Sequence, residues 1–148
     1  MMNISTRGRY GIRACMELAA NFGGRAMQVS QIARVQGIPE KYLAQIIHHL
    51  RKAGLVRSVR GARGGYTLAR PPAEVGLDEI MEALEGTFNP VECVEKPETC
   101  ARVPSCGARV FWCRLRDSVR GALSSMTLKD LVQAESEGRS GESGTYQI

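Results

Sequence analysis

The hydrophobic period of the chain changes at Gly54, and this change limits the possible folds more than any other feature. Residues 39 to 53 carry an apolar residue every three or four positions, which is the period of an α-helix. Residues 55 to 59 and 66 to 69 are short runs rich in apolar and β-branched residues, which favour β-strands. Because the sequence RGARGG connects these two runs, we predict a β-hairpin with two arginines at its tip.

Two further helices are predicted upstream. The first begins near Ser5 or Thr6, either of which can cap it, and ends at the Gly23-Gly24 pair. Its apolar residues recur with the helical period and are Tyr10, Ala14, Cys15, Leu18, Ala19 and Phe22. The second is short, is capped by Ser30 and ends at Gly37. Two helices separated by a glycine-containing turn and followed by a hairpin predict a winged helix-turn-helix.

The second half of the chain predicts a helix that packs along a partner. Residues 77 to 85 form one helix closed by Gly86, and a long helix starts at about Ala108. Apolar residues recur along the long helix at intervals of three and four, at Trp112, Leu115, Val119, Ala122 and Met126. A monomer could bury such a seam, but the pattern favours a dimer interface. A capping box that starts at Thr127 then opens a short helix from Leu128 to Val132.

We therefore predict a mainly α-helical fold with a small β-hairpin wing, in four parts. Residues 1 to 86 form a winged helix-turn-helix DNA-binding domain, and residues 87 to 107 form an irregular, cysteine-rich loop. Residues 108 to 132 form a long dimerisation helix and a short final helix. Residues 133 to 148 are rich in Glu, Ser and Gly and are expected to be a mobile tail.

Positive charge is concentrated in the first half of the chain. The first 70 residues contain twelve Lys or Arg and two Glu, a net charge of +10, whereas the remainder carries −5. Neutralisation of phosphates supplies most of a protein's sequence-independent affinity for DNA, so the basic half predicts a nucleic-acid partner. A basic surface without a partner is the alternative, and the clustering of the charges argues against it.

Composition also limits the compartment. No apolar run approaches the roughly 18 residues needed to span a bilayer, and 43% hydrophobic residues is too high for a wholly disordered chain. The arginines near the N-terminus lie within an amphipathic pattern, so we expect no signal peptide and a cytoplasmic protein. In a reducing compartment, five cysteines favour metal or redox chemistry over a disulfide framework.

The helix of residues 39 to 53 has polar residues outside its apolar stripe. Lys41, Gln45 and His48 are the candidates to face a DNA groove, because an α-helix fits the major groove, Gln pairs with adenine, and Lys binds phosphate or guanine. The hairpin arginines, Arg60 and Arg63, follow directly and are candidates for wing contacts. An ordinary solvated helix face is the alternative.

Four cysteines follow the pattern C-x6-C-x5-C-x6-C, at Cys93, Cys100, Cys106 and Cys113. Structural zinc sites normally use C-x2-C turns, which this pattern lacks. The wider spacing suits an iron-sulfur cluster, which thiolates hold from several ångströms apart. Free structural thiols are the alternative, although three cysteines in a loop with few apolar neighbours are poorly explained as core packing. Cys15 lies on the apolar face of the first helix and is expected in the core.

Several segments of the chain together resemble the IscR, NsrR and CymR family of winged-helix transcription regulators. They are ISTRGRYGIRACMELA, IPEKYLAQIIHHLRKAGLV, SVRGARGGYTLARPP, the cysteine loop, and VFWCRLRD with SSMTLKDLV, within about residues 2 to 133. The resemblance implies a homodimer that places a recognition helix in the major groove of an operator and a wing in the minor groove. It also implies DNA contacts at Lys41, Gln45, Arg60 and Gly61, and an iron-sulfur cluster held by Cys93, Cys100 and Cys106.

Three residues depart from the pattern of the family. Arg109 stands where iron-sulfur biogenesis regulators have a histidine ligand, and Arg9 stands where nitric-oxide sensors have an aspartate. Neither arginine is a plausible ligand, so the cluster type, 2Fe-2S or 4Fe-4S, and the fourth ligand stay open, with Cys113 as one candidate. Ala44 replaces a glutamate with which biogenesis regulators choose between operator classes.

The resulting hypothesis is a regulator whose operator affinity depends on an iron-sulfur cluster and which senses cluster status, iron, oxygen or nitric oxide. One alternative is a cluster-free regulator of cysteine or sulfur metabolism that responds to redox state or a partner enzyme. The terminal residues Tyr146 to Ile148 resemble the ending of such regulators. The other alternative is an electron carrier or redox enzyme. The chain has no nucleotide or flavin motif, and no catalytic arrangement surrounds its two histidines, so we predict that it is not an enzyme.

Overall fold

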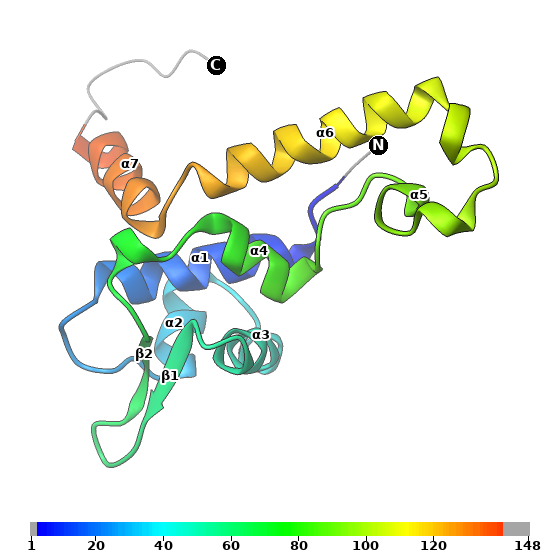
Figure 1. Ribbon diagram of the computed structural model, residues 1–148. Coiled ribbons are helices and arrows are strands. Elements are labelled where there is room, and N and C mark those ends of the chain that lie inside the picture. The colour runs from blue at the N-terminus through cyan, green and yellow to red at the C-terminus, as the bar shows by residue number, and fades with distance from the viewer. Residues whose placement is uncertain (1–2, 141–148) are drawn as a thin grey trace.

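Helix α1 lies at the centre of the N-terminal part of the molecule, and the neighbouring elements pack around it (Figure 1). The computed structural model describes residues 3–140. Its elements in chain order are α1 (Thr6–Ala20), α2 (Val29–Gln36), α3 (Glu40–Lys52), β1 (Val56–Val59), β2 (Gly65–Leu68), α4 (Leu77–Glu85), α5 (Glu92–Glu95), α6 (Gly107–Ser124) and α7 (Leu128–Ser140). A hairpin directly after the third helix confirms the predicted mainly α-helical, winged-helix fold. No helix in this range is long and apolar enough to cross a membrane.

The hydrophobic core takes one face from each element of this N-terminal part. In α3, Leu43, Ile46 and Leu50 recur at intervals of three and four residues and are completely buried. Other fully buried side chains are Leu18, Ile32, Ile47, Val56, Leu68, Ile80, Leu84 and Leu128. Burying each such side chain contributes about 1.5–3 kcal/mol. The packing fixes the orientation of α3 and leaves its opposite face in solvent.

The helix starts follow the expected capping chemistry at α1 but not at α2. Ser5 caps α1, and its side chain accepts a hydrogen bond from the Gly8 N–H at 3.1 Å. The prediction that Ser30 caps α2 was wrong, because α2 already begins at Val29. The preceding residue, Gln28, donates its backbone N–H to the Gln31 side chain at 2.8 Å. An isolated bridge between Met27 and the hairpin fixes the chain just before this point, so the helix starts there.

The two strands form an antiparallel hairpin, with Val56 opposite Leu68 and Val59 opposite Gly65. They start and end within a residue of the predicted runs. The base of the hairpin is buried in the core, whereas its tip is exposed. Gly65 has a φ of 149°, and a Cβ there would collide with the Met27 backbone, which pairs with this strand. The hairpin is therefore anchored at its base and free at its tip.

A short antiparallel bridge ties the end of α6 to the start of α4. The Leu77 N–H donates to the Met126 carbonyl at 3.1 Å, and the Leu128 N–H donates to the Val75 carbonyl at 3.0 Å. Leu128 is fully buried in the core that α1 to α4 form. The predicted capping box at Thr127 is confirmed, since Thr127 and the following helical turn exchange hydrogen bonds through Asp130.

The last helix is longer than predicted. α7 continues to Ser140, so the expectation that it ends at Val132 and that a mobile tail starts at residue 133 was wrong over residues 133 to 140. Side-chain pairs four residues apart support these two turns, Gln133 with Glu137 at 3.2 Å and Glu135 with Arg139 at 3.4 Å. The rest of the predicted tail, including Tyr146 and Ile148, lies outside the described residues.

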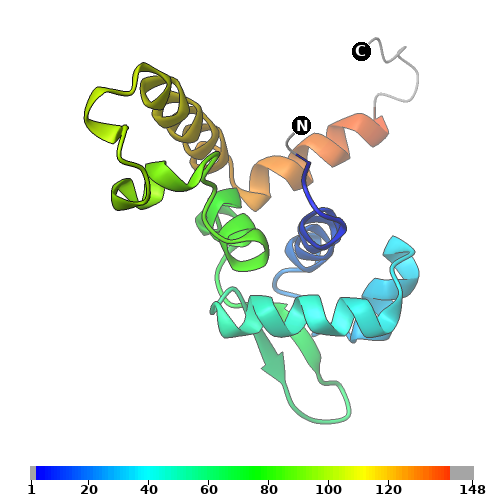
Figure 2. The same ribbon diagram turned by 90° about the vertical axis from the view of Figure 1, so that its right-hand side faces the viewer.

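Helix α6 packs on the rest of the protomer only in part. It starts at Gly107, one residue before the predicted start, and none of its residues, all within the described range, is buried. Figures 1 and 2 show its N-terminal half and the cysteine loop projecting beyond α4. Along the predicted seam, Trp112, Leu115 and Val119 are half-buried, and Ala122 and Met126 are exposed. An apolar side of α6 is thus left uncovered in the protomer.

Candidate DNA-binding surface and cysteine loop

The exposed face of α3 carries a stripe of polar residues. Lys41, Gln45 and His48 are all exposed and follow one another at intervals of four and three residues. A rotation of 100° per residue places them on the side of the helix opposite the buried residues. The structure therefore brings the three predicted groove-facing residues together on one surface.

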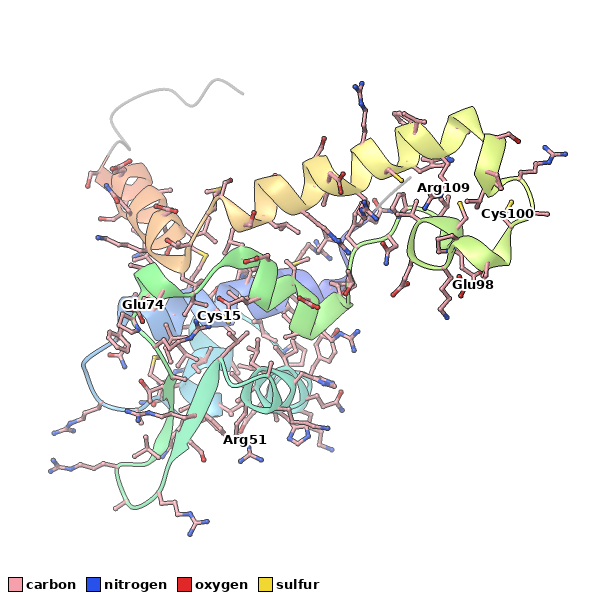
Figure 3. The ribbon with its side chains drawn as sticks, viewed as in Figure 1. Cys15, Arg51, Glu74, Glu98, Cys100 and Arg109 are labelled. Carbon is pink, nitrogen blue, oxygen red and sulfur yellow. The ribbon has the colours of Figure 1, made fainter. Side chains whose placement is uncertain are left out.

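The structure adds two residues that the sequence interpretation did not select. Lys52 continues the stripe, four residues after His48, and is exposed. Arg51 lies beside the stripe, and Figure 3 shows it extending from α3 away from the body, on the side where the hairpin projects. The alternating helical spacing of four and three residues, continued beyond His48, predicts Lys52. Arg51 does not follow from that alternation and becomes a candidate because of where the hairpin lies.

The hairpin tip extends the same surface. Arg60, Gly61 and Arg63 are exposed, and Gly61 has a φ of 109°, which favours glycine at this turn. A tight turn joins the hairpin directly to α3. In this turn the Leu55 N–H donates to the Leu50 carbonyl at 3.0 Å. In Figures 1 and 2 the hairpin projects beyond α3 on the side away from α6. The exposed face of α3 and the hairpin tip thus form one basic surface.

Within residues 3–140, no acidic side chain forms an ion pair with the positive charges on this surface. In residues 3–140 the basic members of the ion pairs are Arg70, Arg116 and Arg139, none of which belongs to α3 or the hairpin tip. Arg70 instead joins the base of the hairpin to α4, through Glu79 at 2.5 Å. Partial burial would raise the pKa of Glu79, but hydrogen bonds from the Gly76 N–H and from Arg70 hold it below its usual value. Within the described residues, the arginines and lysines of α3 and the hairpin tip thus have no acidic partner.

The four clustered cysteines lie in and beside the loop that joins α4 to α6. Cys93 lies in α5, Cys100 follows a single 3-10 turn, Cys106 directly precedes α6, and Cys113 lies within α6. All four are free thiols and half-buried. Cys15 differs from them, because it is fully buried in α1, and burial raises the pKa of its thiol to about 12. The expected core position of Cys15 is confirmed.

The donor set suits an iron-sulfur cluster, although the thiols are not gathered into one site. The chain has four free thiols within 21 residues, and cysteine sulfurs are the ligands that such clusters use. Cys106 and Cys113 line one pocket together with Arg109, and Cys93 and Cys100 do not. Within the described part of the chain, no three Cys, His, Asp or Glu side chains are close enough to hold a metal ion. Ligation by three cysteines would require the loop to close.

Comparison with known proteins identifies the family. The Rrf2 family, described as an iron-dependent transcriptional regulator, matches residues 4–134. The chain belongs to the Rrf2 family. It is 42% identical over 131 residues to the transcriptional regulator CymR of Bacillus subtilis, covering 88% of this chain and 90% of CymR. It is 33% identical to the transcriptional regulator IscR of Cronobacter sakazakii, covering 88% of this chain and 80% of IscR.

Solved structures of Rrf2-type regulators have the same fold. The structure of CymR, the global cysteine regulator of B. subtilis, matches with a TM-score of 0.77 and 40% identity and covers 90% of this chain and 98% of that one. The structure of IscR of T. potens matches with a TM-score of 0.71 and 36% identity, and the match covers 99% of this chain and 94% of that one. The predicted family is thereby confirmed, and the protein is a transcriptional regulator.

Proposed function

We propose that this regulator binds operator DNA as a homodimer and that its affinity depends on an iron-sulfur cluster. The observation that carries the proposal is the set of free, half-buried thiols at Cys93, Cys100 and Cys106. The loop that holds them runs directly into α6, in a chain whose family is described as iron-dependent. Such a protein works in the cytoplasm, where reducing conditions keep thiols free, and has no catalytic role.

For DNA binding, α3 enters the major groove and the hairpin reaches the adjacent minor groove. Gln45 lies in the middle of the exposed stripe of α3, where it meets base edges, and Lys41 and His48 flank it. At the hairpin, Arg60 and Gly61 approach the minor groove and Arg63 binds phosphate. The un-neutralised charge of this surface supports the assignment.

A second copy of the chain covers the apolar side of α6. The Trp112 to Met126 seam is half-buried or exposed in the protomer, and Phe111 beside it is 58% exposed. Pairing of the two α6 helices buries both seams and sets the separation of the two recognition helices, which must match two half-sites on DNA.

Coupling between the loop and DNA then acts through α6. A bound cluster would supply iron-sulfur bonds that link Cys93 and Cys100 to Cys106, at the start of α6. Allosteric couplings in proteins are typically about 1–3 kcal/mol, which would change operator affinity roughly 5- to 150-fold.

Anaerobic purification tests this proposal directly. The expected protein is coloured, absorbs in the visible range and contains iron and sulfide in equal amounts, and removing the cluster changes its operator affinity. A colourless protein without iron that still binds its operator would refute the role of the cluster.

The second candidate function is a cluster-free regulator of cysteine or sulfur metabolism. Similarity to CymR, the global cysteine regulator of B. subtilis, favours it, as does the finding that no three thiols of the described residues are close enough to hold a metal ion. Such a regulator responds to redox state or to a partner enzyme. The colourless, operator-binding protein described above is the result that this candidate predicts.

A further inference from the structure

Arg109 joins α6 to the first cysteine of the loop. Its Nε–H donates a hydrogen bond to the backbone carbonyl of Cys93 at 3.3 Å, across 16 residues of sequence. Figure 3 labels Arg109 on α6 beside the loop that carries Cys100. The side chain is half-buried.

The Cys93 carbonyl needs this donor because of the local sequence. In a continuing helix, that carbonyl would accept from the residue four positions later, but this residue is Pro97, which has no N–H. The preceding bond of the turn is present, from the Lys96 N–H to the Glu92 carbonyl at 2.9 Å. Arg109 therefore supplies a partner that the backbone of α5 cannot supply.

The other hydrogen bonds of the loop, residues 87–106, are all short-range. Backbone bonds join residues three or four apart, for example from the Val103 N–H to the Cys100 carbonyl, and the Thr87 hydroxyl reaches only Glu82. In this part of the chain, the Arg109 bond is thus the one that ties the loop to a distant element.

Arg109 also places a permanent positive charge beside the thiols. It lines the same pocket as Cys106 and Cys113. Residues 87–106 contain three Glu, one Lys and one Arg, and thus a net negative charge before any thiol is ionised. Three thiolates gathered around a cluster would add negative charge, which the Arg109 guanidinium would offset.

We propose that Arg109 is a positioning residue for the cysteine loop. It fixes the Cys93 peptide against the helix that Cys106 begins, and its charge stabilises the gathered thiolates without ligating iron. The part of this inference that concerns the cluster rests on the proposed function, whereas the anchoring of Cys93 does not.

Hydrogen exchange in the metal-free, full-length protein tests the anchor. Loss of one partly buried hydrogen bond in Arg109→Ala should speed amide exchange over residues 93–96 roughly five- to tenfold. Arg114→Ala is the matched control, because Arg114 lies on the same helix and lines the same pocket, and no hydrogen bond is found for its side chain in the described structure. Equal exchange in Arg109→Ala and Arg114→Ala would overturn the anchor. Circular dichroism checks that both variants are folded, and Arg109→Lys serves as a second, milder variant.

The role of the charge is tested by anaerobic reconstitution with ferrous iron and sulfide. Arg109→Gln retains an N–H donor but loses the charge, and we expect it to lose visible absorbance several-fold faster in air than Arg109→Lys. Equal decay rates would overturn the role of the charge. If the wild-type protein takes up no cluster, the proposed function and the charge role both fail, while the exchange experiment still decides the anchor.

Discussion

The Glu85 carboxylate accepts a hydrogen bond from the backbone N–H of Gly8 at 3.1 Å, so the last residue of α4 caps the first turn of α1. Ser5 donates to the same carboxylate from its N–H and its hydroxyl. A Cβ on Gly8 would collide with the accepting oxygen. The contact joins the start of the chain to the point where the cysteine loop begins.

The first prediction follows from this close approach. Relative to Gly121→Ala, Gly8→Ala should lower the free energy of unfolding by about 0.5–1.5 kcal/mol, because the added methyl displaces the exposed Glu85 carboxylate from the hydrogen bonds that it accepts. Urea denaturation measures the change. Gly121→Ala is the control, since nothing lies within 4 Å of its Cβ position in α6. We expect it to be neutral or about 0.5–1 kcal/mol more stable. Equal effects of the two substitutions would contradict the cap.

A second prediction separates base contacts from phosphate contacts. Gln45→Ala and Arg60→Ala should each weaken operator binding by about 1–3 kcal/mol and reduce discrimination against random DNA. Lys41→Ala should weaken binding to both DNAs by the same factor. It should also lower by about one the slope of the logarithm of the binding constant against the logarithm of the salt concentration. Titrations at several salt concentrations measure these effects. Lys129→Ala, an exposed change on α7, is the control, and unchanged operator affinity in both Gln45→Ala and Arg60→Ala would exclude the proposed docking.

The third prediction concerns Arg51, which the sequence interpretation did not select. Because Arg51 extends from α3 on the side where the hairpin projects, Arg51→Ala should weaken binding to operator and random DNA by the same factor. Competition binding on the two DNAs at fixed salt measures it. An effect on the operator alone would instead assign Arg51 to a base.

The fourth prediction assigns the ligands. Cys93→Ser, Cys100→Ser and Cys106→Ser should each abolish the visible spectrum of the anaerobically purified protein, whereas Cys15→Ala should keep it, because Cys15 is in the core. Cys113→Ser decides the fourth position. An unchanged spectrum and cluster lifetime in that variant would exclude Cys113 as a ligand.

The fifth prediction is a pH effect of Cys15. Burial raises its pKa to about 12 in the folded protein, above the value of about 8.5 for a free thiol. The folded state therefore keeps its full stability at pH below about 8.5. Between that pH and about 12, the thiol ionises in the unfolded state only, and the free energy of unfolding falls by about 1.4 kcal/mol per pH unit. Urea denaturation between pH 8 and 10 should show this slope in the wild-type protein and a smaller one in Cys15→Ala. Identical slopes would contradict the assignment.

The helices and the hairpin were predictable wherever local chemistry and packing agree. Gly37 and Gly86 end α2 and α4 as expected, and the residues of the α3 stripe occupy the expected face. One prediction was wrong because a local turn ends the first helix early, with the Phe22 N–H donating to the Ala19 carbonyl and the Gly24 N–H to the Asn21 carbonyl. Phe22 was assigned to the apolar face of the first helix, but α1 ends at Ala20 and Phe22 is 43% exposed.

The candidate site was predictable only in part. Lys41, Gln45 and His48 follow from helical periodicity alone. The contribution of Arg51 depends on where the hairpin lies, and the bond from Arg109 to Cys93 depends on how the loop folds back on α6. Neither is visible in residue spacing. The spacing of the cysteines likewise gives the type of ligand but not whether the thiols converge.

The backbone bridge between residues 75–77 and 126–128 gives α6 a fixed point about which the helix can rotate. The helix is fixed at this end, next to the core, and Cys106 lies at its far end, about 27 Å away for 18 residues. A shift of about 3 Å at Cys106 would therefore rotate the helix by about 6° around the bridge. In a dimer joined through α6, such a rotation turns a small change in the loop into a change in the distance between the two hairpins.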